Sequence, residues 1–312
     1  MKVVKTDGII PPDDANIATL RSAGACLMEK TCLTEDALIE HCADADGLLV
    51  LREPITANVI RALQRCRVIS LFGIGVDMVD LDAAKRAGII VTNVPDSNIE
   101  EVSCHAVAMA LSLSRRLPLF NASLHRGEWN PIQIARGMQR PSTQIFGVVG
   151  LGRIGRLVAE RAMAFGFRVI ACDPTCPGMP GVEMVAMNVL IATADIISLH
   201  VPLTRDTMSL IDEAAVRAMK AGAVLINVSR GGLVDEAALS RALADGHLAG
   251  AGLDTFAEEP VRQDSPLLEA PNVLLSPHIA HFSEQSFAEL RHKAFGEMAR
   301  VLAGETPHYP VG

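Results

Sequence analysis

Residues 145–155 have the sequence Ile-Phe-Gly-Val-Val-Gly-Leu-Gly-Arg-Ile-Gly. The first five form an apolar run typical of a buried strand, and a helical pattern over residues 156–165 follows the last glycine. In this Gly-x-Gly-x-x-Gly string, Gly150 allows a sharp turn, Gly152 allows a pyrophosphate to approach the backbone, and Gly155 allows the helix and strand to pack closely. The string therefore predicts a dinucleotide-binding unit rather than a chance group among the 24 glycines.

A carboxylate supports the same prediction. The next predicted strand, residues 168–172, is followed by Asp173. A carboxylate at that position accepts hydrogen bonds from the ribose hydroxyl groups of NAD, whereas its negative charge repels the 2′-phosphate of NADP. The free amides at the start of the helix bind the phosphates. We therefore expect NAD as the cofactor.

Composition and charge narrow the class of protein. The chain has 312 residues, 49% of them hydrophobic, which suits two domains, and no apolar run approaches the ~18 residues of a membrane span. A net charge of −8 without a lysine/arginine block argues against nucleic-acid binding. The seven scattered cysteines favour reduced thiols over disulfides or a metal site, and the N-terminus lacks a signal-peptide pattern. We expect a cytoplasmic protein with no metal and no membrane association.

Predicted strands and helices alternate along the chain, which indicates parallel sheets with helices on both faces. Beyond those already named, the predicted strands are residues 3–5, 26–28, 47–51, 68–71, 89–91, 196–199, 223–227, 249–254 and 273–276, and the predicted helices are 13–23, 34–42, 56–63, 80–87, 99–114 and 283–303. We expect a cofactor domain over residues 99–282, inserted into a second domain made of residues 1–98 and 283–312. The segment 117–142 fits neither series and is either a loop or an arm that embraces a second subunit.

Three segments that each follow a predicted strand carry the candidate catalytic residues. They are residues 226–235 with Arg230, residues 252–260 with Asp254 and Glu259, and residues 274–281 with His278 and His281. The carboxyl ends of parallel strands meet at one edge of a sheet, where ligands bind. A guanidinium holds a substrate carboxylate in fork geometry, and a histidine paired with a carboxylate gives a proton to a carbonyl oxygen. Arg230, Glu259 and His278 together therefore predict reduction of a ketone beside a nicotinamide, rather than a surface cation, a turn cap and a core histidine.

These motifs resemble the D-isomer-specific 2-hydroxyacid dehydrogenases, and the similarity extends from residues 68–77 to the last predicted helix. The resemblance implies a Rossmann-like and a flavodoxin-like lobe, catalysis by the three residues just named, and a homodimer joined through about residues 117–142. Asp254 is expected at the nicotinamide carboxamide. Substrate contacts are expected from Arg52, Gly73, Ile74, Gly75, Val76, Arg230 and His281, and cofactor contacts from Gly150, Gly152, Arg153, Ile154, Gly155, Asp173, His200, Pro202, Thr207, Val228, Arg230, Asp254 and His278.

The function implied by this resemblance is NAD-dependent reduction of a small 2-oxo acid such as glyoxylate or hydroxypyruvate. Residues 94–96, 100–105 and 281–285 look closest to the branch that includes the C-terminal-binding-protein corepressors. An NAD(H)-sensing scaffold is therefore one alternative, and phosphoglycerate dehydrogenase is another. The chain is expected to lack the C-terminal regulatory domain of many phosphoglycerate dehydrogenases.

Three positions keep more than one interpretation. His200 either lines the adenine pocket or fills the core. His105, on the predicted helix 99–114, is expected to be a packed or interdomain histidine. Met78 stands where the family usually has asparagine, which leaves the chemistry intact and the substrate undetermined.

Overall fold

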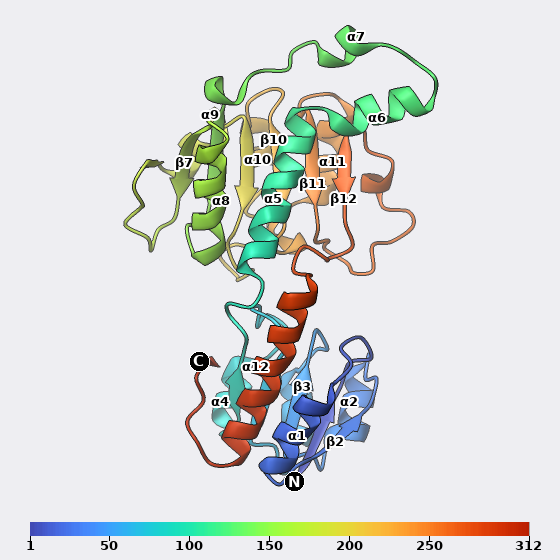
Figure 1. The fold of residues 1–312 in the computed structure, drawn as a ribbon, viewed down its shortest axis with the longest axis vertical. Coiled ribbons are helices and arrows are strands. Elements are labelled where there is room, and N and C mark those ends of the chain that lie inside the picture. Colours follow the sequence, from blue (N-terminus) through green and yellow to red (C-terminus); the bar gives the residue numbers. More distant parts are fainter. Residues whose placement is uncertain (312) are drawn as a thin grey trace. The chain divides into compact units, whose positions relative to one another are not determined.

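The computed structural model of the chain describes residues 1–311, which form two compact units. The first unit comprises Met1–Asn98 and the segment that begins at Ser283, and the second comprises Ile99–Phe282. Each unit has one sheet covered by helices on both faces (Figure 1). The α/β class predicted from the strand–helix alternation is confirmed.

The sheet of the first unit has the strand order β2-β1-β3-β4-β5-β13, which is the flavodoxin-like order with one added strand. Strands β1 to β5 are parallel, and β13 pairs with β5 in the antiparallel sense. The elements are β1 (Lys2–Lys5), α1 (Asp14–Ser22), β2 (Cys26–Glu29), α2 (Glu35–Cys42), β3 (Gly47–Val50), α3 (Ala57–Ala62), β4 (Val68–Leu71), α4 (Leu81–Arg86), β5 (Ile90–Thr92), α12 (Glu284–Leu302) and β13 (Pro310–Val311). The sequence analysis missed β13 because two residues carry no periodicity.

Helix α12 covers one face of this sheet although it lies near the end of the chain (red in Figure 1). A capping box fixes its start, because the Ser283 hydroxyl accepts the amide of Ser286. Its buried Phe295 contacts Phe72, with ring centroids 5.9 Å apart. The predicted helix 283–303 is confirmed, and it belongs to the core of the first unit.

All seven strands of the second unit are parallel, in the order β8-β7-β6-β9-β10-β11-β12. The order reverses between β6 and β9, which is the switch point where doubly wound sheets bind ligands. The elements are α5 (Ile99–Ser114), α6 (Leu117–His125), α7 (Pro131–Ala135), β6 (Ile145–Val149), α8 (Arg153–Ala164), β7 (Arg168–Cys172), β8 (Val182–Met184), α9 (Met187–Thr193), β9 (Ile196–Leu199), α10 (Glu213–Ala218), β10 (Val224–Asn227), α11 (Glu236–Ala244), β11 (Gly250–Leu253) and β12 (Val273–Leu275). Short 3-10 helices lie at Pro141–Thr143, Gly231–Leu233 and Pro266–Leu268.

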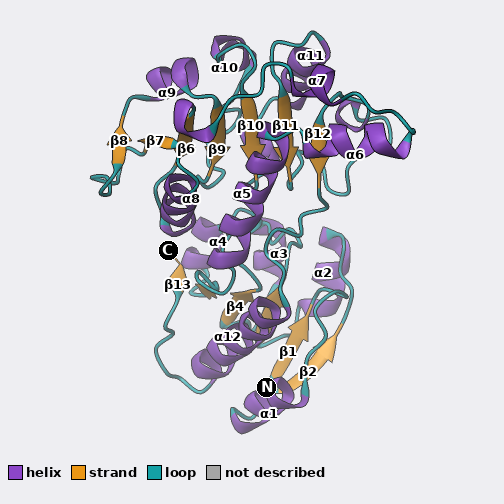
Figure 2. Cartoon of the chain, turned by 45° about the horizontal axis from the view of Figure 1, so that its top comes forward, coloured by secondary structure: helices purple, strands orange, loops and turns teal. Residues whose placement is uncertain are grey.

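The helices of this unit form two layers. Helices α5 and α8 pack on one face of the sheet, and α9, α10 and α11 pack on the other (Figure 2). Helix α8 begins at Arg153 rather than at residue 156, because the glycines of the fingerprint hide the helical periodicity of the first turn. The segment 117–142 is partly helical, since it contains α6 and α7, which the sequence pattern did not predict.

Candidate active site

The glycine fingerprint makes the turn between β6 and α8. Gly150 has a φ of +90°, and a Cβ added there would lie 2.5 Å from the carbonyl oxygen of His200. A Cβ added to Gly155 would lie 2.0 Å from the carbonyl oxygen of Gly150, so the helix and the turn are in direct backbone contact. In contrast, a Cβ added to Gly152 meets no atom within 4 Å. The space over the helix start is therefore open, and the Gly152 cap position supplies no side chain to fill it, as a bound pyrophosphate requires.

Asp173 follows β7 and lies beside this turn. Its Oδ2 accepts the amide of Leu151 at 2.7 Å, while Oδ1 accepts both the amide and the hydroxyl of Thr175 at 2.8 Å. The Cys176 amide donates to the same Oδ1 at 3.1 Å. Burial opposes ionisation, but these donors outweigh it and lower the pKa of Asp173 below its ordinary value. The carboxylate is therefore charged and fixed in orientation.

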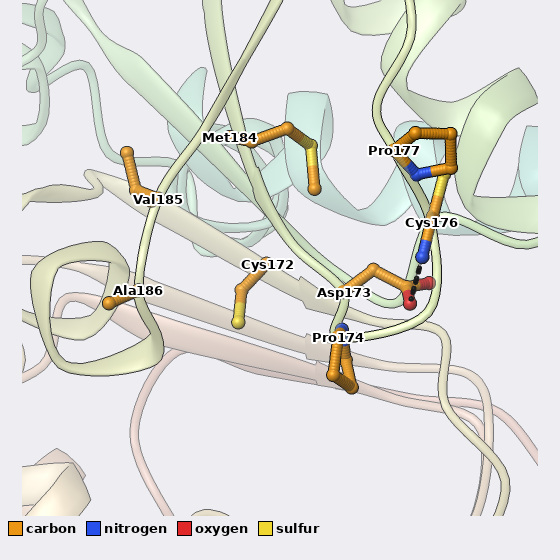
Figure 3. Close-up of a pocket in the computed structure, with 8 residues that line it drawn as sticks. All are labelled: Cys172, Asp173, Pro174, Cys176, Pro177, Met184, Val185 and Ala186. Carbon is orange, nitrogen blue, oxygen red and sulfur yellow. Dashed lines mark hydrogen bonds between the residues drawn. The ribbon is translucent and has the colours of Figure 1, made fainter.

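A cavity of about 400 Å³ opens beside Asp173 (Figure 3). Its lining consists of Cys172, Asp173, Pro174, Cys176, Pro177, Met184, Val185 and Ala186. Around the single carboxylate the walls are mainly apolar, which suits a flat aromatic base joined to a ribose. The sequence analysis missed Val185 and Ala186, because the three-residue strand β8 before them has no readable periodicity.

His200 follows β9 and lies outside the lining of that cavity. Its Nε2 is 2.8 Å from the Ser198 hydroxyl, and desolvation of the ring lowers the pKa of His200 to about 3, so the ring is neutral. The residue is partly buried and belongs to neither core cluster of the unit, so lining of the adenine pocket and filling of the core both stay open for this histidine. In the following loop the Thr207 hydroxyl donates to the Pro202 carbonyl at 2.6 Å, and the Val228 side chain packs in the core. Contacts of Pro202, Thr207 and Val228 with the cofactor stay predictions.

Glu259 and His278 form a hydrogen-bonded pair. Nδ1 of His278 is 2.7 Å from Oε2 of Glu259, and the Phe256 amide donates to the other carboxylate oxygen at 3.1 Å. Because an ionised carboxylate only accepts hydrogen bonds, Nδ1 carries a proton and Nε2 is the atom left for a substrate. The His281 ring stands edge-on to the His278 ring, with centroids 6.0 Å apart. The structure therefore brings both predicted histidines to one place.

Arg230 lies on the neighbouring loop, directly after β10. A Cβ added to Gly231 would lie 1.8 Å from the carbonyl carbon of Phe256, so the backbones of the two loops touch. This contact places Arg230 next to the segment that carries Glu259. The Asn227 side chain donates to the Arg230 carbonyl at 2.8 Å and fixes the backbone there.

Asp254 holds the turn that carries His278. Its buried carboxylate accepts the Ser276 hydroxyl at 2.5 Å and the amides of Ile279 and Ala280 at 3.0 and 2.9 Å. Its carbonyl accepts the amide of His278 at 2.8 Å. His278 has a φ of +52°, a left-handed conformation that costs a non-glycine residue roughly 1–2 kcal/mol. Asp254 therefore stabilises the strained turn, a role that the sequence did not indicate; its contact with the nicotinamide stays a prediction.

In the first unit, the loop after β4 presents main-chain donors. Within residues 1–311, the N–H groups of residues 73–76 donate to no protein acceptor. The carbonyls of Gly73 and Ile74 are tied back, because they accept the Val94 amide at 2.9 Å and the Asn93 side chain at 2.7 Å. The loop is thus held by its carbonyls while its N–H groups are available to an anion.

Glu53 shapes the segment that carries Arg52, after β3. This buried carboxylate accepts the Thr6 hydroxyl at 2.9 Å and the amides of Leu51 and Arg52 at 3.0 and 3.3 Å. The main-chain amides of this segment are therefore used inside the unit. The exposed guanidinium of Arg52 is the group that it offers to a ligand.

Membrane-spanning helices and metal-binding clusters are both absent from the part of the chain that the structure describes. No helix in residues 1–311 is long and apolar enough to cross a bilayer. Over the same residues, no group of three or more His, Cys, Asp or Glu side chains is arranged to hold a metal ion. All seven cysteines are free thiols.

Comparison with known proteins identifies the family. Residues 107–280 match the family described as D-isomer specific 2-hydroxyacid dehydrogenase, NAD binding domain. The chain is 41% identical over 283 residues to a D-3-phosphoglycerate dehydrogenase of Mycobacterium tuberculosis, covering 86% of this chain and 52% of that protein. It is 36% identical over 281 residues to a glyoxylate reductase of Korarchaeum cryptofilum, covering 88% and 85%. A D-lactate dehydrogenase from Aquifex aeolicus, solved with NAD and lactic acid, superposes with a TM-score of 0.85 at 27% identity, covering 98% and 96%.

The chain belongs to the D-isomer specific 2-hydroxyacid dehydrogenase family, and its second unit contains the NAD-binding domain of that family. The open space over Gly152 and the ionised Asp173 fit this cofactor. The chain spans about half the length of the phosphoglycerate dehydrogenases that it matches. Its placement in the corepressor branch stays a prediction.

Replacement of Asp173 tests the basis of cofactor choice. We expect kcat/KM with NADH to exceed that with NADPH by at least ~10-fold, or about 1.4 kcal/mol, because the carboxylate repels a 2′-phosphate. Asp173→Ala should narrow this ratio, mainly by raising the KM for NADH. The control is Glu183→Ala, which removes an exposed carboxylate on β8 that pairs with Arg168 and should leave the ratio unchanged. Equal efficiency of the unmodified protein with both cofactors would contradict the assignment.

Proposed function

We propose that the chain is an NAD-dependent D-2-hydroxyacid dehydrogenase that reduces a small 2-oxo acid. The observation that carries the proposal is the pair formed by His278 and Glu259, with 2.7 Å between Nδ1 and Oε2, within the NAD-binding domain of this family. Such a pair supplies a general acid. Arg230, on the adjoining loop, supplies a guanidinium for the carboxylate of the oxo acid.

Each residue has a separate task in this reaction. When bound, NADH supplies the hydride that reduces the carbonyl carbon. His278 gives its Nε2 proton to the carbonyl oxygen, so a 2-oxo acid, a hydride and a proton yield the 2-hydroxy acid. Glu259 fixes the tautomer and the orientation of His278. Arg230 holds the carboxylate in fork geometry and polarises the adjacent carbonyl.

Residues 73–76 and Arg52 of the first unit are proposed to bind substrate. The available amides of residues 73–76 suit a carboxylate oxygen, and the guanidinium of Arg52 suits a second anionic or polar group. The Glu53 carboxylate, bonded to the Arg52 amide, gives this segment a negative charge, and we propose that this charge makes a phosphate less favourable there than an uncharged group. We therefore propose glyoxylate, hydroxypyruvate or a relative as the substrate. Phosphoglycerate dehydrogenase and an NAD(H)-sensing scaffold are the alternatives.

A panel of 2-oxo acids with NADH separates these functions. We expect kcat/KM for hydroxypyruvate or glyoxylate to exceed that for 3-phosphohydroxypyruvate by at least ~10-fold. The opposite order would assign phosphoglycerate dehydrogenase. Tight NADH binding without turnover of any acid would favour the scaffold, whose output is partner binding.

The proton donor is tested by His278→Ala. We expect turnover of the best oxo acid to fall by roughly 100- to 10,000-fold, the usual contribution of general acid catalysis. NADH binding, followed by its fluorescence, should survive. His247→Ala is the control, since it removes a histidine that bonds to the Val216 carbonyl at 3.1 Å on another part of the unit. Turnover within a factor of ~3 of the unmodified protein would exclude His278 as the acid.

We also propose a homodimer through about residues 117–142. Helices α6 and α7 extend beyond the sheet of the second unit (Figure 1) and expose large apolar side chains. Those exposed by more than half are Leu117, Leu124, Trp129 and Ile132. A contiguous segment with this composition marks a protein–protein contact. The seven free thiols further support a reducing, cytoplasmic compartment.

The homodimer is tested by Trp129→Glu. The Trp129 side chain is 81% exposed, so a charge there should leave the fold intact and break a dimer that covers it. Sedimentation velocity should show a dimer for the unmodified chain and a monomer for the variant. Leu33→Glu is the control, because this side chain is 75% exposed on the first unit and lies outside the segment. A dimer that survives Trp129→Glu would place the interface elsewhere.

A further inference from the structure

A chain of hydrogen bonds runs from helix α5 to the turn that carries His278. Nε2 of His105 is 2.9 Å from the Ser276 hydroxyl, and that hydroxyl is 2.5 Å from Oδ1 of Asp254. His105 is itself 3.9 Å from the same Oδ1. The side chain of His105 is 29% exposed, whereas that of Asp254 is 1% exposed. This series of hydrogen bonds therefore connects a partly exposed histidine to a buried carboxylate.

The direction of each hydrogen bond follows from the donors available. The Asp254 carboxylate can only accept hydrogen bonds, so the Ser276 hydroxyl donates its single hydrogen to that carboxylate. The hydroxyl oxygen must then accept from His105, and Nε2 of His105 carries a proton. His105 thus fixes the rotamer of Ser276, and Ser276 fixes one oxygen of Asp254.

The fixed carboxylate of Asp254 in turn holds the backbone of the turn that carries His278. Its oxygens accept the amides of Ile279 and Ala280, the two residues after His278. Those bonds hold the left-handed backbone of His278, whose φ is +52°. Oδ1 accepts the Ile279 amide and Oδ2 accepts the Ala280 amide, so rotation of the carboxylate breaks at least one of these two hydrogen bonds. The orientation of the His278 imidazole therefore depends on a fixed orientation of the Asp254 carboxylate.

We infer that His105 is a positioning residue for His278, acting through Ser276 and Asp254 to hold the general acid in its strained turn. This inference rests on the proposed function for the identity of the acid. It gives His105 a role beyond the packed or interdomain histidine that the sequence suggested. Its contacts with Ser276 and Asp254 lie entirely within the second unit.

A double-mutant cycle tests the chain of bonds. We expect His105→Leu to lower kcat by about 3- to 10-fold, the range for loss of one hydrogen bond, while the KM for NADH stays within about twofold. Ser276→Ala should have a similar effect. The double variant should lose no more than the larger single loss, because both changes break the same connection. Additive losses, or an unchanged kcat in His105→Leu, would overturn the inference.

Conservative replacements separate positioning from packing. In His105→Gln the side-chain amide reaches the place of Nε2 and should restore kcat to within about twofold, whereas His105→Asn is too short and should behave like His105→Leu. His247→Leu is the matched control, because it removes another half-buried histidine of the same unit and should leave kcat unchanged. Equal losses for the leucine, asparagine and glutamine variants of His105 would indicate a packing role and overturn the inference.

Hydrogen exchange tests the same connection without turnover. In His105→Leu the amides of Ile279 and Ala280 should exchange at least ~3-fold faster, while amides of β10 keep their rates. Unchanged exchange at both amides would overturn the inference. Because this measurement needs no substrate, it distinguishes failure of the hydrogen-bonded chain from failure of the proposed function, which would appear as absence of turnover in the unmodified protein.

Discussion

The parallel direction of the strands in the second unit is the constraint on which the rest depends. Because β6, β7, β9, β10, β11 and β12 run the same way, the residues that follow them reach one edge of the sheet. The glycine turn, Asp173, Arg230, Asp254 and His278 are widely separated in the chain and each follows a strand. A single architectural rule thus assembles the cofactor site and the candidate catalytic residues, and it needs no long connecting loops.

Within that frame, backbone contacts set the spacing of the functional groups. Gly231 touches the backbone at Phe256, and Gly155 touches the backbone at Gly150. Both contacts are too close for any side chain, so the separation of the loops is set by main-chain atoms that have no rotamers. The candidate catalytic side chains of Arg230 and His278 therefore start from backbone positions that vary little.

Much of this arrangement was predictable, because the informative residues are local signals. The strand before Gly150, the carboxylate at Asp173 and the residues after the later strands were all readable from the sequence. The sequence did not reveal the partners of Asp254, the left-handed φ of His278 or the role of Glu53 at Arg52. Each of these depends on segments that meet only in the folded chain. The helices α6 and α7 were also missed, since many of their apolar residues, such as Leu117, Leu124 and Ile132, are exposed and give no clear amphipathic pattern.

The hydrogen bond from the Leu151 amide to Asp173 has an evolutionary consequence. The Asp173 carboxylate, which we expect to bind the ribose, also ties the glycine turn to the end of β7. A substitution that admits a 2′-phosphate at this position also releases the turn that shapes the pyrophosphate site. The two traits are therefore epistatic: a lineage moving toward NADP must first acquire another anchor for the turn, and the order of its mutations is constrained.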